Sequence, residues 1–104
     1  MFKYQIFNIR RKKYDHYLVV NVFNEGKNLH RYLHKIPQNR NFGVMIADSP
    51  STDRSTDLHI LKNYGVDVLL RMAKRSDHSV TLMSAMNFFI KKKIKSIIIT
   101  DGNG

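Results

Sequence analysis

Four short apolar segments, separated by segments with helical spacing, are the feature that most constrains the fold of this chain. They are rich in valine and isoleucine, and their sequences are YLVVNVF (17–23), GVMIAD (43–48), VDVLLR (66–71) and SIIITD (96–101). Their apolar residues are mostly continuous rather than alternating with polar ones, which is typical of strands that are buried on both faces of a sheet. The sequence therefore predicts four strands of a parallel sheet.

Three helices are predicted between these strands. The first covers residues 25–36, where apolar residues recur at helical spacing before Pro37, and the second covers residues 53–64, followed by Gly65. The third covers residues 78–93, with one apolar stripe. Strands that alternate with helices in this way predict an α/β fold, with a Rossmann-like open parallel sheet and helices on both of its faces.

The length of 104 residues and the hydrophobic fraction of 42% fit a single compact domain. Within it, residues 17–104 carry the predicted strands and helices. Residues 1–16 are aromatic and basic without a clear period, and they are expected to form either a mobile lead-in or an added edge element. No apolar run approaches 18 residues, and the N-terminus lacks the ordered regions of a signal peptide, so a cytoplasmic location is expected.

The formal net charge of +10 is concentrated in two runs, RRKK (10–13) and KKKIK (91–95). Such an excess suits nucleic acid, an anionic membrane surface or a phosphate-bearing ligand. Lysine-rich runs are also common in solvated linkers and at helix C-termini. A nucleic-acid-binding domain needs basic residues interleaved with exposed aromatic residues on one face, or a recognisable reading helix. The sequence shows neither, so nucleic acid is not expected as a partner.

Polar and acidic residues follow three of the four predicted strands. Because the carboxyl ends of parallel strands meet at one edge of a sheet, and ligands bind there, these residues predict a binding site. The candidate residues are Phe23 and Glu25 at and just beyond the end of the first strand, Asp48 at the end of the second, and Asp101 and Asn103 at and just beyond the end of the fourth.

The residue types at this edge suit a nucleoside diphosphate. A carboxylate such as Asp48 can accept hydrogen bonds from a base or a ribose, and Phe23 can offer its ring to the base. Asp101 and Asn103 supply the oxygen ligands that Mg²⁺ or Mn²⁺ prefers. Simpler interpretations exist for each element: Ser51 or Asp53 as a helix N-cap, Phe23 as a core residue, and the DGNG segment (101–104) as an ordinary turn.

Taken together and in order, these segments resemble family 2 glycosyltransferases, the inverting GT-A-fold enzymes that include dolichol-phosphate mannosyltransferases. VVNVFNEGKNL resembles the family's opening strand and helix, V-I-P-x-Y/F-N-E-x-x-x-L, and IADSPSTDRSTD resembles its V-V-D-D-G-S-T-D-x-S/T element. IIITDGNG is similar to the strand that carries the D-x-D motif. The resemblance covers about residues 17–104.

The resemblance implies a nucleotide-sugar donor, such as a UDP- or GDP-sugar, and a divalent metal ion. It implies that Phe23, Glu25 and Asp48 contact the nucleoside, and that Asp101 and Asn103 hold the ribose, the diphosphate and the metal. This sequence departs from the family pattern in having Asn103 where the last carboxylate of D-x-D is usual. Because an amide carries no charge, metal binding is expected to be weaker or optional.

The resemblance also implies the strand order 3-2-1-4, counting the four predicted strands, and a catalytic base in an acceptor-binding half beyond Gly104. This chain is therefore expected to be the donor-binding half of a glycosyltransferase, with doubtful activity in isolation. The alternatives are a non-catalytic nucleotide-binding remnant and a basic nucleic-acid-binding domain. Because many family members act on lipid-linked acceptors, Arg10, Arg11, Lys12 and Lys13 are expected to contact an anionic membrane, with the protein peripheral to it.

Overall fold

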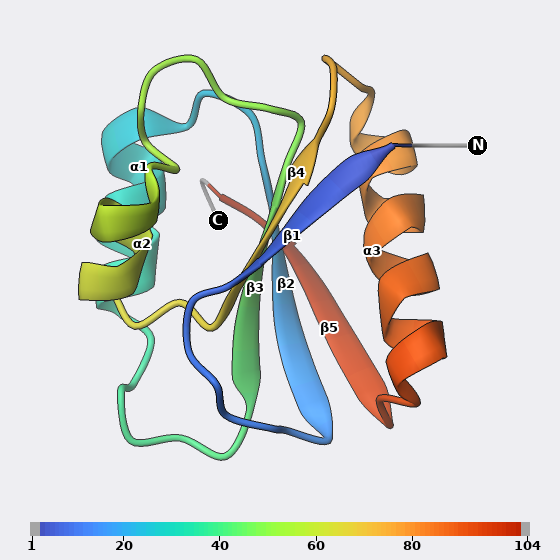
Figure 1. The fold of residues 1–104 in the computed structure, drawn as a ribbon. Coiled ribbons are helices and arrows are strands. Elements are labelled where there is room, and N and C mark those ends of the chain that lie inside the picture. Colours follow the sequence, from blue (N-terminus) through green and yellow to red (C-terminus); the bar gives the residue numbers. More distant parts are fainter. Residues whose placement is uncertain (1–2, 103–104) are drawn as a thin grey trace.

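The computed structural model describes residues 3–102, which form a five-stranded sheet between helices (Figure 1). The elements, in chain order, are β1 (Tyr4–Asn8), β2 (His16–Val22), α1 (Gly26–His34), β3 (Gly43–Asp48), α2 (Leu58–Asn63), β4 (Val68–Met72), α3 (His78–Lys92) and β5 (Ser96–Asp101). The alternation of strands and helices after β1 is the one that the apolar pattern predicts. Among residues 3–102, the helices lack the length and the apolar character that a membrane span requires.

The sheet has the order β1-β4-β3-β2-β5 and is mixed rather than wholly parallel. The four predicted strands pair in parallel, β4 with β3, β3 with β2, and β2 with β5. This is the expected relative order of those four strands. The prediction of a four-stranded, all-parallel sheet is wrong, because the N-terminal segment adds β1 antiparallel to β4.

Two alternatives were expected for residues 1–16, a mobile lead-in or an added edge element. Over Tyr4–Asn8 the structure shows the edge element, β1. Tyr4 and Ile6 are half-buried and pack against the core on one face, and Phe7 does so on the other. Antiparallel strands at the edge of an otherwise parallel sheet are common, because an edge strand needs only one hydrogen-bonded neighbour. Residues 1 and 2 lie outside the described part of the chain.

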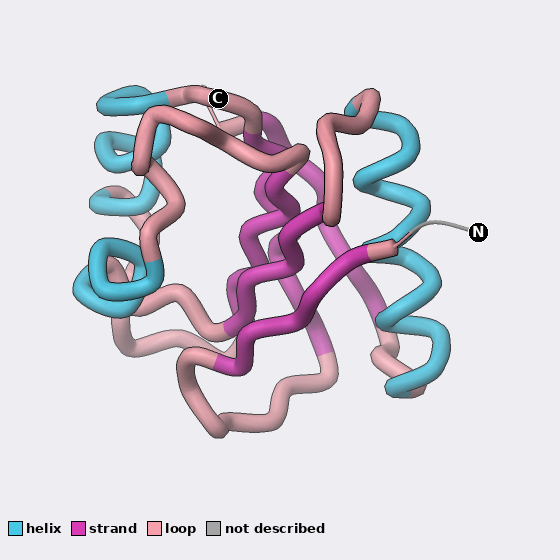
Figure 2. Tube along the Cα trace, turned by 45° about the horizontal axis from the view of Figure 1, so that its top comes forward, coloured by secondary structure: helices cyan, strands magenta, loops and turns pink. Residues whose placement is uncertain are grey.

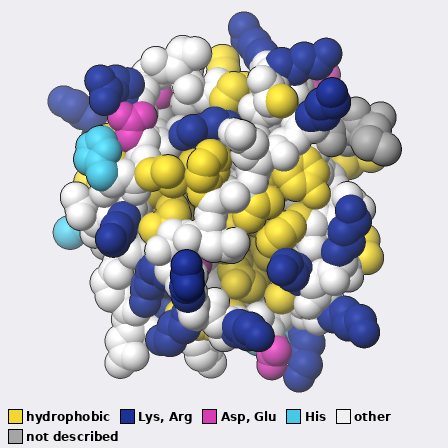
Figure 3. All heavy atoms as spheres, in the orientation of Figure 1, with side chains coloured by type: hydrophobic (Ala, Val, Ile, Leu, Met, Phe, Trp, Pro, Cys, Tyr) yellow, Lys and Arg dark blue, Asp and Glu magenta, His cyan; other side chains and the backbone are white. Residues whose placement is uncertain are grey.

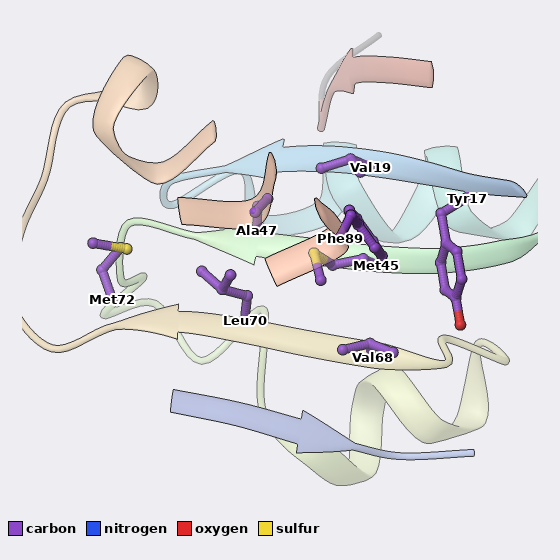
Figure 4. Packing of buried hydrophobic residues seen from close by; sticks show 9 residues of the cluster. Tyr17, Val19, Met45, Ala47, Val68, Leu70, Met72 and Phe89 are labelled. Carbon is purple, nitrogen blue, oxygen red and sulfur yellow. The ribbon is translucent and has the colours of Figure 1, made fainter. Parts of the chain in front are cut away.

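Helices cover both faces of the sheet, as predicted. Helices α1 and α2 lie on one side and α3 on the other (Figures 1 and 2). The face toward α3 is filled by side chains from every central strand and from the helix itself (Figure 4): Tyr17, Val19, Met45, Ala47, Val68, Leu70, Met72, Ala85 and Phe89. The other face packs a second cluster against α1 and α2, in which Leu29, Leu33 and Leu61 are fully buried. Both cores depend on the uninterrupted apolar runs of the strands.

The second helix is shorter than predicted. It begins at Leu58 instead of residue 53, and its N-cap is Asp57. The polar segment 49–57 is therefore an ordered loop at the carboxyl end of β3, and neither Ser51 nor Asp53 caps α2. The sequence pattern missed this because serine, threonine and aspartate are common both at N-caps and in loops.

Candidate functional site

The carboxyl ends of the parallel strands meet at one edge of the sheet, as the sequence predicts. Val22 of β2 lies opposite Asp48 of β3, and Asn21 lies opposite Asp101 of β5. Backbone hydrogen bonds continue past the strands, from Ser49 N to Val22 O at 3.1 Å and from Gly102 N to Asn21 O at 3.0 Å. The loops after β2 and β3 therefore leave the sheet side by side, and Gly102 continues β5 beside β2.

Asp48 is fully buried, and the protein itself occupies its carboxylate. Oδ1 accepts hydrogen bonds from the amide and the hydroxyl of Ser51, at 2.7 and 2.8 Å. Oδ2 accepts one from the Thr56 hydroxyl at 2.6 Å and lies 3.5 Å from Nε of Arg71. These contacts tie the loop after β3 to strand β4. In this structure Asp48 organises the loop and does not face solvent.

Glu25, Asp48 and Asp101 share the edge, but they do not line one open groove, as their common position at strand ends suggests. Successive side chains of a strand point to opposite faces. Asp48 pairs with Val22, and Asp101 pairs with the preceding residue, Asn21, so the two carboxylates belong to opposite faces of the sheet. A shared edge therefore does not place Asp48 and Asp101 in one groove, because a one-residue offset in register changes the face.

Glu25 and the end of β5 do come together. A Cβ atom added to Gly102 would lie 3.0 Å from Cγ of Glu25, so the absence of a side chain at Gly102 allows this close approach. Asp101 is exposed beside it. Asn21, opposite Asp101 in the register, is 1% exposed, and its Oδ1 has no hydrogen-bond partner in the described structure. An unpaired buried oxygen is costly, and it marks this point as one where a ligand or water would be stabilised.

Asn24 joins the loop after β2 to the loop after β3. Its backbone amide donates to the Ser51 hydroxyl at 2.9 Å, and its side-chain oxygen accepts from the Thr52 amide at 2.7 Å. Asn24 has a φ of 52°, in the left-handed region that asparagine tolerates better than most residues. Asn24 of the FNEG segment (23–26) therefore has a structural role, in addition to any role of this segment in binding.

Asp53 connects the same loop to the start of α1. It accepts hydrogen bonds from the Ser55 hydroxyl at 2.6 Å and the Ser55 amide at 3.0 Å. Burial alone would raise the pKa of Asp53, but these bonds and those from the Gly26 and Asp53 amides outweigh it and hold the pKa below its usual value. The carboxylate is thus stabilised in its charged form.

This shift predicts a pH dependence of stability. A carboxyl group whose pKa is lower in the folded state stabilises the fold above its unfolded pKa, about 3.9, and loses that contribution as the pH falls through the folded pKa. We expect the urea midpoint of the wild type to fall more between pH 5 and pH 3 than that of Asp53→Asn. Equal losses in the two proteins would show that Asp53 is not stabilised by this loop.

Phe23 lies at the same edge, half-buried, with the guanidinium of Arg75 over its ring at 4.6 Å from the centroid. The two residues line a pocket of about 550 Å³ with Ser76, Asp77 and His78, at the start of α3. The segment after β4 is therefore also part of the site. Sequence reasoning missed it because the third strand end carries no acidic residue directly after it. The KRSDH run (74–78), which is polar and precedes a helix, is the signal that would have found it.

The described residues do not form a complete metal site. Within residues 3–102, no three His, Cys, Asp or Glu side chains gather in a way that would hold a metal ion. Asp101 is exposed and available as one oxygen ligand, whereas Asn103, its expected partner, lies outside the described residues. A metal ion at this edge would therefore need oxygen atoms from a bound ligand to complete its coordination.

Comparison with known proteins adds no assignment: no family model, no curated protein and no solved structure matches this chain.

Proposed function

We propose that the carboxyl edge of the sheet binds the nucleoside diphosphate of a nucleotide-sugar donor, and that this Rossmann-like chain is the donor-binding half of an inverting glycosyltransferase. The observation that carries the proposal is the strand order. The chain leaves β2 toward β3 and β4 and then returns to β5 on the other side of β2. Ligands of open α/β sheets bind outside the strand ends where the order reverses. That point is between β2 and β5, where Glu25 and Gly102 are in contact.

The residues around this point divide into two groups. Phe23 and Arg75 offer an aromatic ring and a planar cation, which suit a base and a phosphate respectively. Glu25 and Asp101 offer carboxylate oxygen atoms, which suit ribose hydroxyls and a divalent cation. Asp48 keeps the loop between these groups in place and is assigned no ligand contact.

Asp101 and Asn103 are the residues proposed to hold Mg²⁺ or Mn²⁺. The metal ion would neutralise the charge of the diphosphate and so assist its departure from the sugar. Transfer to an acceptor also requires a base that removes a proton from the attacking hydroxyl. No residue of this chain is assigned that role, so the proposal concerns donor binding and not turnover by this chain alone.

Membrane contact through residues 10–13 is not part of this proposal. These residues form the loop that enters β2, at the amino ends of the parallel strands. The candidate site lies at the opposite end of a molecule whose dimensions are 32 × 31 × 22 Å. A bilayer bound by this loop would face away from the site, so a lipid-linked acceptor gives no reason for the contact.

The proposal predicts that the diphosphate is required for binding. We expect UDP or GDP with Mg²⁺ to shift amide signals of the protein with a dissociation constant in the millimolar range, about −4 kcal/mol. Uridine and guanosine should bind at least about tenfold more weakly, because they lack the group that Arg75 and the metal ion recognise. NMR titration of the four compounds measures this. Nucleosides that bind as tightly as the diphosphates would contradict the proposal.

A further inference from the structure

The fold brings the two basic runs of the sequence together, at the end of the molecule opposite the candidate site. Residues 10–13 lie in the loop that enters β2, and residues 91–95 form the last residues of α3 and its connection to β5, the neighbour of β2. The Lys95 amide donates to Asp15 O at 2.8 Å, which fixes the two segments side by side. In Figure 3, Lys and Arg side chains surround exposed hydrophobic ones on the lower part of the visible face.

Few acidic residues oppose this charge. Oδ2 of Asp15 lies 3.4 Å from Nζ of Lys95. The carboxylate of Asp67 is buried, with Nη2 of Arg40 at 2.8 Å and Nε of Arg10 at 3.6 Å. Within residues 3–102, six cations at this end have no carboxylate within 4 Å: Arg11, Lys12, Lys13, Lys91, Lys92 and Lys93. Their charge is available to an external anion.

Five of these cations, all except Lys91, line a pocket together with aromatic rings. The pocket has a volume of about 650 Å³ and is lined by residues 10–15, by residues of α3 and its C-terminal end, and by the aromatic rings of Tyr14, Tyr17, Phe88 and Phe89. Lys12 lies over the ring of Tyr14 and Lys92 over that of Phe88, each with Nζ 5.7 Å from the centroid. Tyr14 and Phe88 are only half-buried, so their rings are accessible beside the cations.

We propose that this basic–aromatic pocket binds single-stranded nucleic acid. Proteins that bind single strands without sequence preference combine a positively charged groove for the phosphates with aromatic rings on which bases stack. Here Arg11, Lys12, Lys13, Lys92 and Lys93 would contact phosphates. Tyr14 and Phe88 would stack with bases. From the sequence alone, the basic residues and the aromatic residues could not be placed on one face, because the two basic runs are about 80 residues apart. The fold removes that separation.

An anionic membrane fits the same charge less well. Surface proteins that enter a bilayer interface bury an exposed apolar face in it. The large hydrophobic residues exposed in the described structure are Leu58, Met83, Met86, Ile90, Ile98 and Ile99, and none of them lines this pocket. A pocket lined by cations and aromatic rings matches a nucleobase and its phosphates better than it matches a flat lipid surface.

Fluorescence anisotropy with a labelled twelve-nucleotide oligo(dT) or oligo(U) tests the proposal. The logarithm of the association constant should fall linearly with the logarithm of the salt concentration, with a slope of about −0.7 for each phosphate contacted. Lys12→Glu/Lys92→Glu should weaken binding at 50 mM salt by at least about tenfold and make the slope less steep. Tyr14→Leu should weaken binding on the order of tenfold without changing the slope, because it removes stacking and no charge, whereas Tyr14→Phe should retain affinity.

Lys27→Glu/Lys62→Glu is the matched control, since it makes the same change in net charge at exposed positions outside the pocket. It should reduce affinity much less than Lys12→Glu/Lys92→Glu. Equal losses in the two double variants, or no effect of Tyr14→Leu, would overturn the assignment of this pocket. The assignment would also be overturned if the protein sedimented with phosphatidylserine vesicles but bound no oligonucleotide. Circular dichroism of each variant confirms that it is folded.

Discussion

Replacing Asp48 with alanine should lower the free energy of unfolding by about 3 kcal/mol and the melting temperature by roughly 15 °C. The carboxylate is fully buried and accepts three hydrogen bonds, two from Ser51 and one from Thr56. Its removal would leave these donors without an acceptor, and Arg71 would lose its buried counter-charge. Urea unfolding followed by circular dichroism measures the loss.

Asp101→Ala is the control for this prediction. Asp101 is exposed at the end of β5 and makes no ion pair within residues 3–102, so its removal should change stability by less than about 0.5 kcal/mol. The comparison separates the two carboxylates that sequence reasoning placed in one site. If Asp48→Ala is as stable as the wild type, the hydrogen bonds to Asp48 do not stabilise the fold. Asp48 would then again be a candidate for ligand contact.

Most of the strands and helices could be predicted from the sequence because their signals are local. The apolar runs at 43–48 and 96–101 coincide with β3 and β5, and the other predicted strands differ by one or two residues at their ends. The third helix, predicted over 78–93, covers His78–Lys92. Continuous apolar runs and helical spacing are properties of neighbouring residues, so they can be recognised without knowledge of the fold.

The features that were missed depend on contacts between distant segments. For residues 1–16 the sequence left a mobile lead-in and an edge element open, because the segment YQIFN (4–8) becomes a strand only by pairing with β4. Asp48 is buried with a counter-charge from Arg71, which lies opposite it on the next strand, 23 residues later. The two basic runs form one surface only because β5 pairs with β2. None of these neighbours can be identified from local sequence alone.

Asp101→Asn should remove most of the effect of metal ions on nucleotide binding while the protein stays folded. Asp101 is the one carboxylate at the end of β5, and it is exposed next to the contact between Glu25 and Gly102. Its charge is what a divalent cation between protein and diphosphate would require. We expect Mn²⁺ to strengthen binding of UDP or GDP by at least about tenfold in the wild type and by much less in the variant. Calorimetric titration with Mn²⁺ or with EDTA measures the difference.

The most direct test of the proposed donor site is the position of the metal ion in the nucleotide complex. Bound Mn²⁺ broadens nearby amide signals, whereas Mg²⁺ does not. With UDP or GDP present, small amounts of Mn²⁺ should broaden the signals of Phe23–Gly26 and Asp101–Gly102 most strongly, and Asp101→Asn should abolish this pattern. Broadening that is strongest at the amino ends of the strands, near Asp15 and Asp67, or that is uniform over the protein, would contradict a donor site between β2 and β5.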